Sequence, residues 1–149
     1  MSTGSDNDDG SIVAGGVVDG LEIKRNVLAE KQEDYGYILV ATKCFAKGTV
    51  ILQEEPLLTF KAKDPDDYID KFSTSMKDVK DKILEMAHRP LEDIDQGLKE
   101  DGTKLANKYG LDSNEVIIAL DVRHTNAFSF GTTGNASLFW CACKANHAW

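Results

Sequence analysis

The cysteine and histidine residues near the C-terminus are the first candidates for chemistry. Cys141 and Cys143 are separated by one residue, and His147 follows four residues later. Thiolates and imidazole suit zinc, and a structural zinc site needs four ligands, so Cys44 would have to supply the fourth. Cysteine is also among the most buried residue types and behaves as a small apolar side chain. We therefore expect a structural role for these cysteines, with zinc binding as the alternative, and we assign no metal-binding residue.

Asp121, His124 and Ser129 have the residue types of a hydrolytic triad. However, the glycine-flanked turn that would expose a nucleophilic serine is missing, and no glycine-rich phosphate-binding motif is present. We interpret the three residues as a solvated helix end and expect no catalytic residue among them.

Four aromatic residues follow in the same part of the chain: Phe128, Phe130, Phe139 and Trp140. Such side chains can line a pocket, but they most often pack in a core. We expect core packing, and we expect the intervening glycine- and threonine-rich residues 131–135 to form a loop.

Composition limits the possible classes of function. The chain has 149 residues, of which 42% are hydrophobic and 28% charged, as is typical of one soluble globular domain. Its net charge of −8 argues against direct nucleic-acid binding, which needs a basic surface. The start of the chain does not resemble a signal peptide, and no apolar run approaches the roughly 20 residues that span a bilayer. We expect an intracellular protein, nuclear or cytoplasmic, without membrane contact.

A β-rich part precedes a helical part. Residues 1–20 are acidic and rich in glycine and serine, which predicts disorder. Residues 21–30 read as a strand or a short helix. Residues 34–58 predict an antiparallel hairpin with strands at 37–41 and 50–52, joined by residues 46–49 with Gly48 at positive φ.

Residues 61–124 carry helical signals. Asp64 and Pro65 predict a helix start. A second helix is expected over 75–88, with Ser75 and Asp78 as a capping pair and Met76 on its apolar face.

Apolar residues at helical spacing continue to residue 120. Gly102 is expected to interrupt the next helix and Gly110 to end it. Asp112 is expected to cap a last helix, with Glu115 three residues later.

Two separated stretches resemble the SET domain of protein-lysine methyltransferases. Residues 36–58, GYILVATKCFAKGTVILQEEPLL, resemble the family's opening hairpin. Residues 125–128 (TNAF), 137–139 (SLF) and 144–147 (KANH) resemble its cofactor-binding segment. The helical block 61–124 lies where SET-and-MYND and fungal SET proteins carry a helical insert. The resemblance covers residues 21–149 and implies an α+β fold.

The resemblance implies S-adenosylmethionine as cofactor and a protein lysine as methyl acceptor. The residues that match the family's cofactor contacts are Gly36, Tyr37, Ile38, Asn126, Asn146 and His147. The family's catalytic tyrosine and the strands that complete its β core belong to its later half, which has no match here. We therefore expect a partial SET domain, truncated at the Asn-His motif, with an incomplete β core and little turnover. The alternative is a non-enzymatic module that binds a protein partner through the helical block.

Overall fold

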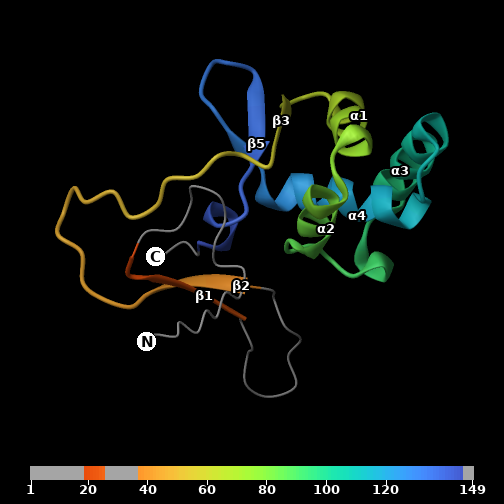
Figure 1. Cartoon of the computed structure of the whole chain (residues 1–149). Coiled ribbons are helices and arrows are strands. Elements are labelled where there is room, and N and C mark those ends of the chain that lie inside the picture. The colour runs from red at the N-terminus through yellow and green to blue at the C-terminus, as the bar shows by residue number, and fades with distance from the viewer. Residues whose placement is uncertain (1–18, 26–36, 146–149) are drawn as a thin grey trace, which may run out of the picture.

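The computed structural model describes residues 19–25 and 37–145. These residues form two small antiparallel sheets and a group of helices, so the expected α+β class is confirmed (Figure 1). The predictions about residues 1–18, Gly36, Asn146 and His147 lie outside the described residues. No helix within the described ranges is long and apolar enough to cross a membrane.

The first sheet pairs β1 (Leu21–Arg25) with β2 (Tyr37–Ala41). This confirms the strand rather than the helix alternative for the first segment. The predicted hairpin between 37–41 and 50–52 is wrong, because β2 pairs with β1 along its whole length. The turn at Gly48 does form, with φ of 89° and a hydrogen bond from Thr49 N to Ala46 O of 3.1 Å. Residues 50–52 could pair with only three residues of β2, whereas all five residues of β1 pair with β2 in register.

The second sheet has the order β3-β5-β4, from β3 (Leu58–Lys61), β5 (Asn135–Leu138) and β4 (Phe128–Ser129). The loop expected between Phe130 and Asn135 connects β4 to β5. Thr59 and Ser137 face each other across β3 and β5, with their hydroxyl oxygens 2.7 Å apart. This sheet packs on the helices through β3, which contacts α1 (Pro65–Thr74).

The start of α1 follows from its own residues. Asp64 accepts a hydrogen bond from Asp67 N at 3.1 Å, and Pro65 occupies the first turn, as expected. The face of α1 that turns inward carries Tyr68 and Phe72, both fully buried. Burial of these rings attaches the helix to the core.

The next helix, α2, is shorter than expected and spans Lys77–Glu85. Ser75 ends α1, and its hydroxyl donates to Lys71 O at 2.7 Å, so its predicted pairing with Asp78 is wrong. Met76 precedes α2 and is 74% exposed, which also contradicts its predicted place on the apolar face. A short helical turn, η1 (Leu91–Asp93), follows Pro90.

The third helix, α3 (Gln96–Tyr109), continues through Gly102, where we expected an interruption. A Cβ atom at this position would lie 2.5 Å from Ile117 Cγ1. Glycine is therefore used here for close approach to α4 (Ser113–Asn126) and not to break the helix. The predicted C-cap at Gly110 is confirmed by its φ of 67°, and the predicted cap of α4 is confirmed by a 3.0 Å hydrogen bond from Glu115 N to Asp112.

The core is centred on α4, which contacts α1, α2 and α3 (Figure 1). Val116, Ala119, Leu120 and Val122 of this helix are buried among side chains from the other elements. Tyr68 donates its hydroxyl hydrogen to Ala119 O at 2.8 Å, so the buried phenol is satisfied. The C-terminal end of α4 consequently has a fixed position, and it carries Asn126.

Candidate cofactor-binding site

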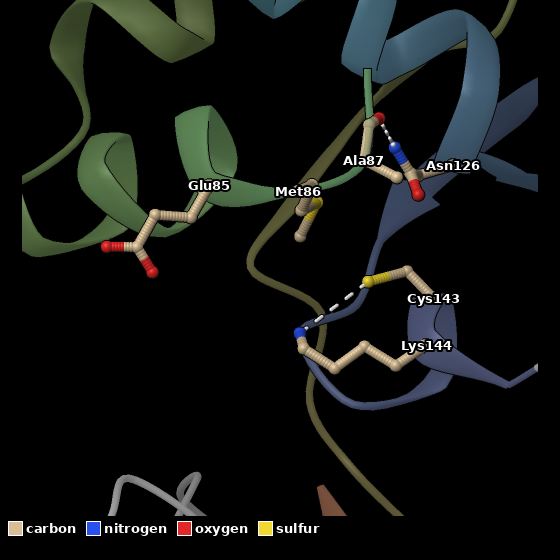
Figure 2. Close-up of a pocket in the computed structure, with 6 residues that line it drawn as sticks. All are labelled: Glu85, Met86, Ala87, Asn126, Cys143 and Lys144. Atoms are coloured by element: carbon tan, nitrogen blue, oxygen red, sulfur yellow. Dashed lines mark hydrogen bonds between the residues drawn. The ribbon is translucent and has the colours of Figure 1, made fainter. Parts of the chain in front are cut away.

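Asn126 ends α4 and is 8% exposed. Its amide nitrogen donates to Ala87 O at 2.8 Å and to Val122 O at 3.0 Å. Figure 2 shows this nitrogen directed at Ala87, with the amide oxygen on the opposite side. The hydrogen bond to Ala87 O therefore holds the chain that follows α2 against the end of α4, whereas the bond to Val122 O lies within α4.

A small cavity lies beside Asn126, lined also by Met86, Cys143 and Lys144 (Figure 2). Its volume is about 10 Å³, which is close to the minimum for a single water molecule. A cofactor does not fit in this space. In this conformation Asn126 therefore acts on its protein neighbours.

The predicted cofactor segment begins with η2 (Ala142–Lys144), which immediately precedes Ala145 and Asn146. This turn contacts β2, the strand that follows Gly36. In Figure 1 the turn, coloured blue, lies next to the two-stranded sheet. The fold thus brings together the sequence neighbours of the two stretches that resemble the family's cofactor motifs. Ile38 in β2 is half-buried.

Glu54 fixes the start of η2. Its carboxylate accepts hydrogen bonds from Cys141 N, 3.0 Å from each oxygen, and from Ala142 N at 2.6 Å. A carboxylate satisfies the free N–H groups at the start of such a turn. No sequence pattern indicates this contact, because Glu54 and Cys141 lie 87 residues apart in the chain.

Lys144 is 5% exposed, and its ammonium group lies 3.2 Å from the centroid of the Trp140 ring. It donates to Trp140 O and lies 3.9 Å from Cys143 Sγ. Burial lowers the pKa of Lys144, and the nearby thiols and Glu54 oppose this shift. Burial also raises the pKa of Cys143, and it raises that of Cys141 to about 11.

The alternative zinc site gains no support within the described ranges. No group of three or more metal-ligating side chains occurs there. Cys44 is exposed, whereas Cys141 is fully buried. Because the thiolate is the metal-binding form, the raised pKa values of Cys141 and Cys143 disfavour it. His147 lies outside the described residues.

The Asp121, His124 and Ser129 side chains do not form a triad. Asp121 is fully buried, and both of its carboxylate oxygens accept hydrogen bonds from Arg89. The interpretation as a solvated helix end is therefore wrong for Asp121, although His124 is exposed. The carboxylate is used to hold Arg89, in the connector between α2 and η1, against α4.

Phe128, Phe130 and Phe139 line an open groove at the surface. Phe128 and Phe130 are 41% and 43% exposed, and each packs edge-to-face on Phe139. With Leu52, Glu54 and their neighbours they line an open cavity of about 420 Å³. The expectation of core packing is thus wrong for Phe128 and Phe130, and it is confirmed for Trp140, which is 9% exposed.

We found no protein-family model, no curated protein and no solved structure that matches the chain. The functional interpretation therefore depends on the residues and their geometry.

Proposed function

We propose that this chain forms the cofactor side of a SET-type protein-lysine methyltransferase and binds S-adenosylmethionine. The observation that best supports the proposal is the contact between β2 and η2. Two stretches that resemble the family's cofactor motifs are far apart in the sequence, and their immediate neighbours meet in space. In the family that the chain resembles, the two motifs contact one cofactor, so the resemblance predicts that they meet.

The charges around η2 also fit a cationic cofactor. A sulfonium is disfavoured by neighbouring positive charge. Glu54 places a carboxylate at the start of η2, which lowers the electrostatic cost of a positive charge nearby. When bound, S-adenosylmethionine supplies an electrophilic methyl group. In this proposal the backbone at Gly36 to Ile38 and the side chains of Asn146 and His147 hold the cofactor.

Asn126 has a positioning role in the proposal, because the cavity beside it holds no more than a water molecule. The resemblance assigns no residue of this chain to deprotonation of the lysine substrate. We therefore propose cofactor binding as the activity that the residues of this chain support.

Calorimetry with S-adenosylmethionine tests the proposal, with adenosine as the matched ligand that lacks the sulfonium and the amino acid. We expect S-adenosylmethionine to bind with a dissociation constant below about 1 mM, equivalent to about 4 kcal/mol, and more tightly than adenosine. Asn146→Ala and His147→Ala should weaken binding. Asn107→Ala, at an exposed position of α3, should not. Absence of measurable binding would refute the proposal.

The alternative function, a protein-interaction module based on residues 61–124, has no specific support among the described residues. Apart from Met76, the large exposed apolar side chains lie outside this block, at Val50, Ile51, Phe128 and Phe130.

A further inference from the structure

The open groove beside β4, which we call the aromatic groove, is lined by Phe128, Phe130 and Phe139. Leu52 and Glu54 also line it, from the segment that leads to β3. Among the described residues of its lining, Glu54 is the only charged one. The volume of about 420 Å³ lies within the range of roughly 300–1,000 Å³ that small-molecule sites occupy. The groove therefore has the size of a ligand site and an acidic lining.

The three rings are arranged so that ring faces stay open. Phe128 and Phe139 have their centroids 5.9 Å apart and an interplanar angle of 69°, and Phe130 and Phe139 have 6.1 Å and 83°. In each edge-to-face contact one ring uses its edge, so its own faces stay available. Phe128 and Phe130 are also exposed, so a ligand can reach them. Because the face of an aromatic ring is its negative side, it attracts a cation.

The Glu54 carboxylate adds a negative charge at a fixed position. It is held by the N–H groups of Cys141 and Ala142, which are uncharged donors, so the carboxylate keeps its charge. Lys144 also interacts with Glu54, but its ammonium group lies over the Trp140 ring, and Lys144 does not line the groove. Ring faces and carboxylate together favour a ligand that carries a positive charge.

We propose that the aromatic groove binds a small quaternary ammonium ligand with an uncharged, hydroxyl-bearing tail, as in choline. A trimethylammonium group has no N–H donor, so it loses no hydrogen bond when ring faces replace water around it. The uncharged polar residues Gln53 and Ser129 also line the groove and suit a hydroxyl group. A ligand with a carboxylate tail would instead be repelled by Glu54. Such binding does not require the proposed binding of S-adenosylmethionine.

Titration of the full chain with choline, followed by nuclear magnetic resonance, tests the proposal. The matched probe is the neutral isostere of choline, in which a tert-butyl group replaces the trimethylammonium group. We expect the trimethyl resonance of choline to move upfield, because ring faces shield the methyl groups above them. The amide resonances of Ser129 and Ala142 should move to saturation, and that of Asn107 on α3 should not. The dissociation constant should be about 1 mM, and about tenfold lower than that of the isostere.

Two pairs of variants separate the rings from the charge. Phe130→Leu keeps an apolar side chain but removes a ring, so choline should bind about fivefold more weakly. Phe45→Leu, which removes a ring outside the groove, should not weaken binding. Glu54→Gln removes the charge and should weaken choline about threefold without weakening the isostere. Glu55→Gln, at the exposed neighbour outside the lining, should have a smaller effect.

Equal affinities of wild type for choline and for its isostere would overturn the proposal, because the groove would then have no preference for charge. Absence of saturable shifts up to about 10 mM choline would also overturn it. Glycine betaine, which has a carboxylate tail, should bind more weakly than choline, and tighter binding of betaine would refute the uncharged tail.

Other occupants of the groove would give different results. A peptide with trimethyllysine that binds where choline does not would assign the groove to a modified protein. A dimer in sedimentation, with no choline-dependent shifts, would assign it to a second copy of the chain. Either result overturns a choline-type ligand. If Phe130→Leu folds poorly, the comparison of choline with its isostere on the wild-type chain still decides.

Discussion

Replacement of Asp121 by Asn should test the ion pair that fastens the α2–η1 connector, residues 86–90, to α4. Asp121 Oδ1 lies 2.6 Å from Arg89 Nη2 and 3.0 Å from Arg89 Nε, and Oδ2 accepts from Arg89 N at 2.7 Å. Asparagine keeps one acceptor oxygen but places an NH₂ group opposite an Arg89 donor. The substitution therefore leaves at least one donor without an acceptor and the guanidinium without its buried counter-ion.

The expected cost follows from the burial of the two partners. Removal of one partner costs about 3–5 kcal/mol in a fully buried pair, and an exposed pair contributes about 0–1 kcal/mol. The Asp121 side chain is 0% exposed and that of Arg89 is 44% exposed. Water thus reaches one partner, and we expect an intermediate loss of about 2–3 kcal/mol in the free energy of unfolding.

Urea unfolding at pH 7, followed by circular dichroism, measures this loss. Asp95→Asn is the matched control, because Asp95 also contacts Arg89, at 3.3 Å, but is 66% exposed. Asparagine also remains a good N-cap at the start of α3, so this control should cost less than about 1 kcal/mol. If Asp121→Asn destabilises no more than Asp95→Asn, the reasoning from burial is refuted.

The same pair predicts a pH dependence. Burial acts to raise the pKa of Asp121, but the hydrogen bonds and charge of Arg89 outweigh it and hold the pKa below its usual value of 3.8. The stabilisation is therefore complete above the unfolded-state pKa and is lost as pH falls through the folded-state pKa. The difference in stability between wild type and Asp121→Asn should be constant near neutral pH and shrink below about pH 4.

Three further outcomes are expected. Gly102→Ala should destabilise the chain by about 1–2 kcal/mol, because overpacking against Ile117 outweighs the gain in helix propensity. Gly97→Ala in the same helix, where a Cβ atom meets nothing closer than 3.8 Å, should instead stabilise it by about 0.5–1 kcal/mol in urea unfolding; equal effects of the two would contradict the packing argument. A maleimide should modify exposed Cys44 rapidly and buried Cys141 only after unfolding, as peptide mass spectrometry will show. Burial raises the pKa of Cys141 from 9.0 to about 11, so the contribution of this thiol to the free energy of unfolding should fall as pH rises from 9 to 11. An increase of that contribution over the same pH range would contradict the raised pKa.

The starts of α1 and α4 and the end of α3 were decided by the sequence itself. The Asp64 and Asp112 caps each act on an N–H group three residues later, and Gly110 ends α3 through its own left-handed conformation. Such interactions are local, so residue type and spacing suffice to predict them. The five-residue strand at Tyr37–Ala41 was predictable for the same reason, from its own β-branched and aliphatic residues.

Only the tertiary structure decided which segments meet. The partner of β2 is β1 rather than residues 50–52. Glu54 reaches η2 across 87 residues, and Arg89 reaches Asp121 across 32. These contacts form because burial in the common core brings the segments together, and no short-range pattern records that proximity. The contact of β2 with η2, which supports the proposed cofactor site, belongs to the same class.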